Sequence, residues 1–258
     1  MTLTQQRITA VVYGALCHAF FLVGVATMIA AMYFGMSLSI GPFAEPWSWI
    51  ANGLLLAQFI AGHSFLLSGR GRAVLAGLAP QSLGRDLSTT TYALIASIQI
   101  LLLFGLWSPT GVVWWQAQGT TLIVMTCLYA LAWVLLGKSM QDAGLQLQSG
   151  LLGWWAVVRN KKPVYPPMPQ TGLFKLTRQP IYVSFTLTVW TVPTWTPDQL
   201  VVAITLTLYC VLGPLLKEAR FLKIYGAAFE DYRRRTPYWL PWPRRSTRRA
   251  ALEGKHGQ

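Results

Sequence analysis

Long apolar segments alternate with short polar ones along the chain, and the apolar segments are close to the length of a membrane-spanning helix. Such a helix needs about 20 mostly apolar residues to cross the hydrocarbon core of a bilayer. Six segments approach this requirement, at residues 8–34, 47–67, 90–107, 119–137, 181–195 and 199–216. The fifth is short for a full crossing. The pattern predicts an all-α, polytopic membrane protein with about six transmembrane helices.

Only a short turn separates the last two apolar segments. This turn, TVPTWTPDQ at residues 191–199, contains Pro193 and Pro197. Proline interrupts a helix because it lacks the backbone N–H and clashes with the preceding turn. We expect a tight C-terminal helical hairpin, whose first arm is tilted or begins irregularly near Pro180.

The distribution of basic residues tests this division of the chain. With the N-terminus inside, all 21 Lys and Arg residues fall in segments on the inner side, and the three outer loops hold only Glu45 and Asp198 as charged residues. Cytoplasmic loops of membrane proteins carry the excess of Lys and Arg. We therefore expect both termini in the cytoplasm, and the membrane to be a bacterial inner membrane.

The composition supports a membrane protein and limits its partners. Hydrophobic residues make up 53% of the chain and charged residues 11%, which is atypical of soluble domains. The net charge of +13 lies beside the membrane, where anionic lipid headgroups attract basic residues. We expect anionic lipids rather than nucleic acid as partners, and a disordered basic tail at 241–258. The three cysteines stand singly in apolar segments, so no metal site is expected.

Polar residues concentrate in two regions on the expected cytoplasmic side, the loop at 138–178 and the stretch at 215–241. In the second, apolar residues recur at helical spacing opposite charged ones. This pattern predicts an amphipathic helix on the inner leaflet or beneath the bundle.

Two charged residues stand at the expected membrane boundary. Glu218 lies among apolar residues, where an isolated carboxylate is costly and needs a partner. One interpretation is a structural ion pair with Arg178 or Arg220, and the other is a contact with a ligand at the membrane mouth. Arg178, directly before an apolar run, is either an ordinary snorkelling anchor or part of the same doorway.

Two stretches resemble the C-terminal signature of the isoprenylcysteine carboxyl methyltransferase superfamily. They are TRQPIYVSF at 177–185 and KEARFLKIYGAAFEDYRRRTPYWLP at 217–241. The matching positions are Arg178, Pro180, Tyr182, Glu218, Gly226, Tyr232 and Pro237. Upstream stretches at 54–66, 84–97, 101–109, 142–150 and 189–196 are similar to the membrane methanethiol S-methyltransferases and their NnrU-like relatives.

The resemblance implies an S-adenosyl-L-methionine-dependent membrane methyltransferase acting on a small hydrophobic thiol or related acceptor. It implies that Arg178 and Glu218 are catalytic. The implied cofactor-binding residues are Arg178, Gln179, Tyr182, Glu218, Tyr232 and Arg235. It divides the chain into a four-helix region at 1–137, a cofactor region at 138–240 with the loop, hairpin and amphipathic helix, and the tail.

Three residues are candidates for contact with the substrate: His63, Arg85 and Tyr92. His63 falls near the inner end of the second apolar segment. Three interpretations stay open for it, namely a hydrogen bond within the bundle, a substrate contact and a haem ligand. Arg85 and Tyr92 match an upstream stretch of the family, and a structural role is the alternative for both.

Two positions depart from the family pattern. The histidine of its motif is Gln179 here, and the first glutamate of its acidic pair is Lys217. Glutamine donates and accepts hydrogen bonds but does not titrate near neutral pH as histidine does. Lysine adds positive charge beside a cationic cofactor. The alternative to the methyltransferase is therefore an NnrU-like membrane protein without methyltransferase activity.

Overall fold

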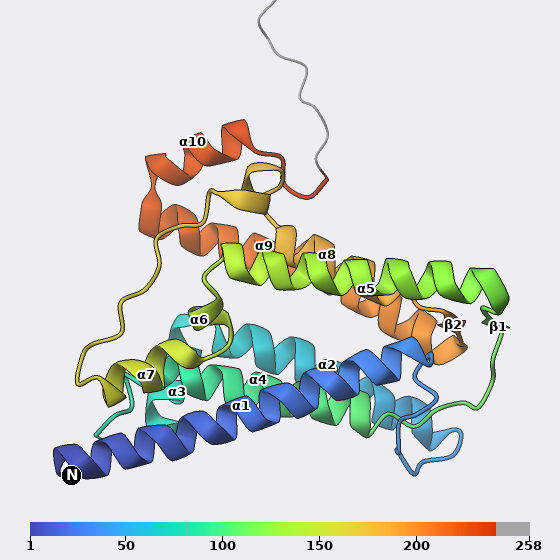
Figure 1. Ribbon diagram of the computed structural model, residues 1–258, viewed down its shortest axis with the longest axis horizontal. Helices are drawn as coiled ribbons and strands as arrows, with labels where there is room; N and C mark the ends of the chain where they lie inside the picture. The colour runs from blue at the N-terminus through green and yellow to red at the C-terminus, as the bar shows by residue number, and fades with distance from the viewer. Residues whose placement is uncertain (81, 241–258) are drawn as a thin grey trace, which may run out of the picture.

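The computed structural model describes residues 1–80 and 82–240, which are mostly helical (Figure 1). Five helices in this part of the chain are long and apolar enough to cross a membrane: α1 (Leu3–Tyr33), α2 (Trp47–Leu66), α4 (Ser88–Gly105), α5 (Gly119–Asp142) and α9 (Pro197–Tyr225). The shorter helices are α3 (Gly69–Leu78), α6 (Leu145–Gln148), α7 (Leu151–Val158), α8 (Pro180–Trp190) and α10 (Ala227–Arg235), with a 3-10 turn η1 (Gly172–Lys175). An all-α, polytopic membrane protein is confirmed. The predicted tail at 241–258 lies outside the described residues.

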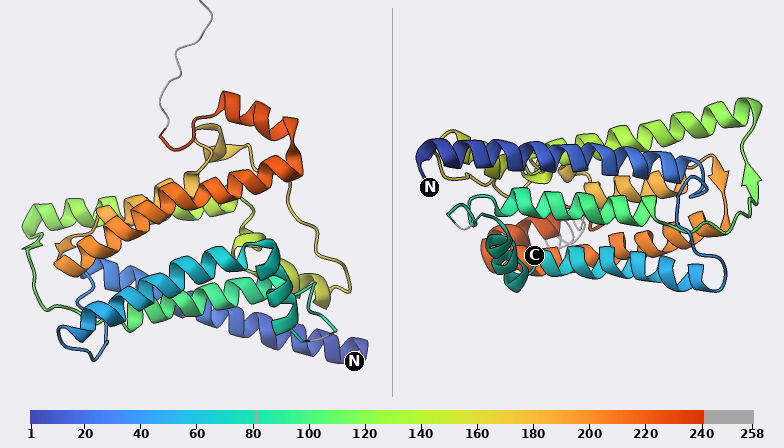
Figure 2. Two further views of the ribbon diagram at one scale, coloured as in Figure 1. Left: turned by 180° about the vertical axis from the view of Figure 1, so that it is seen from behind. Right: turned by 90° about the horizontal axis from the view of Figure 1, so that it is seen from below.

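The membrane helices form two layers (Figures 1 and 2). Helices α1, α2 and α4 make one layer, and α5, α8 and α9 make the other. A shared apolar core joins the layers, with Phe59 of α2, Phe104 of α4 and Leu206 of α9 among its buried members. The hydroxyl of Tyr129 on α5 also donates to the Ile29 carbonyl of α1 at 2.8 Å.

The hairpin made by α8 and α9 differs from the prediction in its first arm. α8 has 11 residues and ends at Trp190, short of the predicted residue 195. At about 1.5 Å per residue it is about 16 Å long, against about 30 Å for the hydrocarbon core. Pro193 explains the early end, because the residue before a proline is driven out of the helical conformation. The chain continues as strand β2 (Thr194–Trp195), which pairs antiparallel with β1 (Trp115–Gln116).

The predicted amphipathic helix is divided into two pieces. α9 continues to Tyr225, Gly226 takes a positive φ of 49°, and α10 then begins with Ala227. Glycine tolerates this φ because it has no Cβ. The buried aromatic residues of α10, Phe229 and Tyr232, pack with Met168 in a separate small core. The break at Gly226 folds α10 back along the last part of α9, on the side away from α1, α2 and α4 (Figure 1).

Candidate functional site

The C-terminal signature comes together where α8 begins and α9 nears its end. Pro180 occupies the first turn of α8, where its missing N–H leaves no helical hydrogen bond unmade. Glu218 lies on the last part of α9, two turns before Gly226. The chain after α10 returns to this place, since the Arg178 N–H donates to the Pro237 carbonyl at 3.0 Å. Three separate segments of the signature thus meet.

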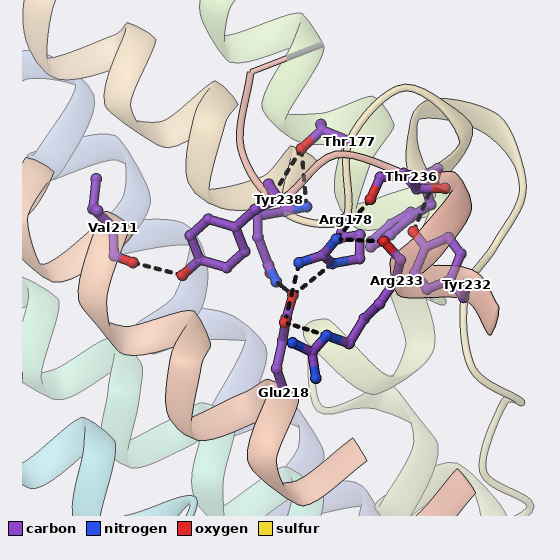
Figure 3. A network of polar contacts seen from close by, with 10 residues as sticks. Thr177, Arg178, Val211, Glu218, Tyr232, Arg233, Thr236 and Tyr238 are labelled. Atoms are coloured by element: carbon purple, nitrogen blue, oxygen red, sulfur yellow. Dashed lines mark hydrogen bonds and ion pairs between the residues drawn. The ribbon is translucent and has the colours of Figure 1, made fainter. Parts of the chain in front are cut away.

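Arg178 and Glu218 form a buried, two-pronged ion pair (Figure 3). Nε of Arg178 lies 2.8 Å from Oε1 of Glu218, and Nη2 lies 3.2 Å from Oε2. Only 7% of the Arg178 side chain and 10% of the Glu218 side chain are exposed. This geometry matches the guanidinium fork to both carboxylate oxygens. Of the two arginines considered for Glu218, the structure selects Arg178, whereas Arg220 donates to the Leu67 carbonyl.

The remaining nitrogen of Arg178 binds the chain that follows α10. Nη1 donates to the Thr236 carbonyl at 2.6 Å and to the Arg233 carbonyl at 3.2 Å. The guanidinium carbon also lies 5.5 Å from the ring centre of Tyr238. Burial raises the pKa of Tyr238 to about 12, so its hydroxyl stays a donor at neutral pH and bonds the Val211 carbonyl at 2.6 Å. Arg178 thereby ties the end of the described chain to α8 and α9.

Gln179 supplies a third donor to Glu218. Its Nε2 lies 2.8 Å from Glu218 Oε1, and its side chain is almost fully buried. Its Oε1 is also buried and has no hydrogen-bond partner. A buried acceptor without a partner costs about 1–3 kcal/mol. The amide therefore has one bonded end and one unbonded end within the same cluster.

A small cavity lies beside this cluster, between α8, α9 and α10. Its volume is about 10 Å³, enough for about one water molecule. Its polar lining consists of Arg178, Gln179, Lys217 and Glu218. Its apolar and aromatic lining consists of Pro169, Phe174, Phe221, Phe229 and Tyr232. A charged wall thus faces an aromatic one.

Lys217, on the polar wall of the cavity, is held between two aromatic rings. The Nζ atom of Lys217 lies 5.4 Å from the ring centre of Tyr182 and 5.7 Å from that of Phe221. Aromatic faces attract a cation at such distances. Lys217 lines the cavity, and Tyr182 lies one side chain further from it.

The two predicted cofactor residues on α10 are placed differently from one another. The Tyr232 hydroxyl donates to the Phe174 carbonyl at 2.7 Å, and burial raises its pKa. Arg235 lies on the exposed side and pairs with Asp231 at 2.6 Å. Arg233 is the arginine of this run that approaches Glu218, with its Nε 3.9 Å from Oε2.

The three predicted substrate residues do not all lie together. The Tyr92 hydroxyl is 2.5 Å from Nε2 of His63, so these two residues form a pair between α4 and α2. Arg85 is exposed in the chain before α4. Four of the predicted site residues meet at the cavity: Arg178, Gln179, Glu218 and Tyr232. Their roles stay predictions. The roles of His63, Tyr92 and Arg85 stay predictions as well.

The sequence analysis placed Lys217 beside the cofactor, and Lys217 lines the cavity. It did not identify two other contributors to the site, Arg233 and Thr236. Arg233 stands in a run of three arginines, and only a helical register could have separated it from Arg235. Thr236 acts through its backbone carbonyl, for which a sequence carries no side-chain signal.

Comparison with known proteins identifies relatives by sequence. Methanethiol S-methyltransferase 1 of Bradyrhizobium diazoefficiens is 30% identical over 204 residues, covering 76% of this chain and 67% of the relative. Methanethiol S-methyltransferase of Mycobacterium tuberculosis is 26% identical over 251 residues, covering 94% and 100%. Nurim of Sus scrofa is 27% identical over 192 residues, covering 69% and 70%. No protein-family model matches the chain, and no solved structure matches it.

Proposed function

The chain belongs to the family of membrane methanethiol S-methyltransferases, and from this premise we propose that it methylates a small hydrophobic thiol with S-adenosyl-L-methionine. It is an integral membrane methyltransferase. We place the site of transfer at the cavity between α8, α9 and α10, on the cytoplasmic side of a bacterial inner membrane, with both termini in the cytoplasm. The observation that carries the placement is the buried cluster of Arg178, Gln179 and Glu218.

The polar atoms of the cluster fit such a methyl donor. Gln179 Oε1 is buried without a partner and would accept a hydrogen bond from a ribose hydroxyl or an amino group. Arg178 and Lys217 would face the donor's carboxylate, and Glu218 would accept from its polar hydrogens. Gln179 therefore replaces the family's histidine as a hydrogen-bonding group without a need to titrate.

A donor of this size requires the cavity to open. Room for about one water molecule is far too small for a nucleoside. α10 contributes Phe229 and Tyr232 to the cavity, and the chain enters it from α9 at Gly226. The hydrogen bonds from Tyr232 to the Phe174 carbonyl and from Arg178 to the Arg233 carbonyl hold it in the closed position. A rotation of α10 about Gly226 would move both aromatic side chains away and admit the donor from the cytoplasm.

When bound, the donor supplies an activated methyl group on a cationic sulfur. The chain's own residues would then hold it in place, and Phe174, Phe229 and Tyr232 would screen the enlarged cavity from water. Transfer to a thiolate removes a positive and a negative charge together, and a partly desolvated site favours this. A small protonated thiol is apolar enough to arrive through the bilayer. The transfer therefore belongs at the junction of membrane and cytoplasm.

Headspace analysis tests this function. Purified protein with isotope-labelled S-adenosyl-L-methionine and a panel of thiols should release labelled dimethyl sulfide from methanethiol, and Arg178→Ala should lower the rate at least about a hundredfold. Asp231→Asn, in an exposed ion pair on α10, is the matched control and should keep the rate. Absence of product with every thiol would favour the alternative, an NnrU-like protein without this activity.

A further inference from the structure

We propose that His63 and Tyr92 form the base that removes the proton from the thiol before methyl transfer. This inference rests on the proposed function and adds the acceptor's side of the reaction. A thiol with a pKa of about 8.5 or above is mostly protonated at neutral pH, and the thiolate is the nucleophile. The cavity at Glu218 holds a carboxylate already bonded to three donors, which leaves it poorly suited to act as that base.

The geometry of the pair leaves one ring nitrogen available. Tyr92 of α4 and His63 of α2 meet at 2.5 Å through the hydroxyl and Nε2. Nδ1 of His63 is buried and has no hydrogen-bond partner. When Nε2 carries the proton and donates to the Tyr92 oxygen, Nδ1 presents a lone pair. That atom is the acceptor a thiol proton needs.

A purely structural role explains the pair less well. The same two helices are already joined by a reciprocal contact, in which Gln58 Nε2 donates to the Gln99 carbonyl and Gln99 Nε2 donates to the Gln58 carbonyl. These bonds are 3.1 Å and 2.9 Å long. A histidine adds little to this connection, whereas a hydrocarbon side chain would avoid the cost of an unpaired buried nitrogen.

The surroundings of the pair suit a small thiol and its anion. The ring centroid of His63 lies 5.3 Å from that of Phe59 and 6.3 Å from that of Tyr209. These two rings provide an aromatic wall. Arg220, from α9, donates to the Leu67 carbonyl directly after α2, and its positive charge would favour a thiolate.

The pair is connected to the proposed methyl-donor cavity by α9. Lys217, held over the ring of Tyr182, lines the cavity. Tyr209, whose ring centroid lies 6.3 Å from that of His63, belongs to α9, the helix that also carries Lys217 and Glu218. Helix α9 thus contributes residues both to the surroundings of the pair and to the cavity.

The reaction balances as follows. The thiol S–H bond breaks, its proton binds Nδ1 of His63, and the resulting imidazolium donates from Nε2 to the Tyr92 oxygen. The thiolate sulfur then forms a bond to the methyl carbon, while the bond between that carbon and the donor sulfur breaks and its electron pair stays on the donor sulfur. The products are two neutral thioether groups. His63 releases its proton to water before the next turnover.

The test is the pH dependence of methyl transfer to methanethiol in His63→Gln. General bases contribute about a hundredfold or more, so we expect kcat/KM at pH 7 to fall about a hundredfold. Only thiolate from solution can then react, and the rate should rise about tenfold per pH unit, whereas the wild-type rate should be nearly flat between pH 7 and 8.5. Tyr92→Phe should lower the rate about tenfold and keep the flat profile. His18→Gln is the matched control, a membrane histidine bonded to Trp154 on α7, and should change nothing.

Two further measurements separate the possible failures. The ¹³C shift of labelled methanethiol, added without methyl donor, should differ between wild type and His63→Gln, because only wild type offers Nδ1 as an acceptor for the thiol hydrogen. Calorimetry with S-adenosylhomocysteine should give equal heats for both proteins. If His63→Gln transfers methyl groups at the wild-type rate, or if its rate is lower by the same factor at every pH, the proposal that His63 removes the thiol proton is overturned. If wild-type protein neither transfers methyl groups nor binds S-adenosylhomocysteine, the proposed function fails as well.

Discussion

Arg178 and Glu218 meet through two hydrogen bonds at 2.8 Å and 3.2 Å although 40 positions separate them in the chain. The pair fastens the start of α8 to the last part of α9. A buried ion pair contributes little net stability compared with apolar side chains of similar volume, because both charges lose water. Its position on the wall of a cavity, with a further donor from Gln179, therefore favours a role in binding.

Loss of the carboxylate should destabilise the protein. Glu218→Ala leaves the Arg178 guanidinium buried and only partly compensated by carbonyl oxygens, and breaking such a pair costs about 3 kcal/mol. Thermal unfolding in detergent should show a clearly lower midpoint. Asp231→Ala breaks an exposed pair worth less than about 1 kcal/mol, and its midpoint should be close to that of wild type. Equal midpoints for the two variants would contradict the buried pair.

Removal of the Gln179 amide should weaken binding of the methyl donor without unfolding the protein. Gln179→Leu keeps the size of the side chain but deletes both the donor to Glu218 and the unpaired Oε1. One lost hydrogen bond of about 1 kcal/mol corresponds to about a fivefold weaker Kd. Titration with S-adenosylhomocysteine measures it. An unchanged Kd would show that neither end of the amide contacts the ligand.

A glycine in η1, the turn that carries Phe174, should control the shape of the cavity. Gly172 has a φ of 58°, and a Cβ there would overlap the Asp142 carboxylate, which accepts from the Leu173 N–H at 2.9 Å. Gly172→Ala should displace the segment that carries Phe174 and weaken donor binding about tenfold. Gly111→Ala is the matched control, because it has a φ of 74° but open space around its Cβ. It should cost about 1–2 kcal/mol in stability and leave binding unchanged. Equal binding losses in both variants would refute the role of the segment.

Lys217 should discriminate against a cationic donor. It lines the cavity and is held over the rings of Tyr182 and Phe221. A positive charge near the site opposes a sulfonium more than a neutral thioether. Lys217→Met should therefore improve the affinity for S-adenosylmethionine relative to S-adenosylhomocysteine several-fold. A ratio of the two Kd values that stays constant would place the charge away from the reacting sulfur.

Hydropathy predicted the fold well where a helix is apolar along its whole length. It underestimated the length of α9, because the helix continues to Tyr225 although charged residues begin at Lys217. It overestimated the length of α8, because residues 191–195 carry no charge but Pro193 ends the helix. Short helices such as α7 contain too few residues for a pattern to define them.

The site was predictable to the extent that it depends on charge compensation. A buried carboxylate requires a cation, and Arg178 and Arg220 were the two candidates. Arg220 stands two residues from Glu218 on α9, and residues two apart on a helix do not face each other. The hairpin of α8 and α9 instead brings Arg178 to the carboxylate. The exposed position of Arg235 likewise depends on the helical register of α10.

Calorimetry with S-adenosylhomocysteine tests most directly whether the Arg178–Glu218 cluster holds the methyl donor. Wild-type protein in detergent, and Asp231→Asn, should bind with equal heat and saturate below millimolar concentration. Glu218→Gln, which keeps the shape of the side chain and removes its charge, should bind at least about tenfold more weakly. Absence of heat from wild-type protein at millimolar ligand, or an unchanged Kd in Glu218→Gln, would contradict the account.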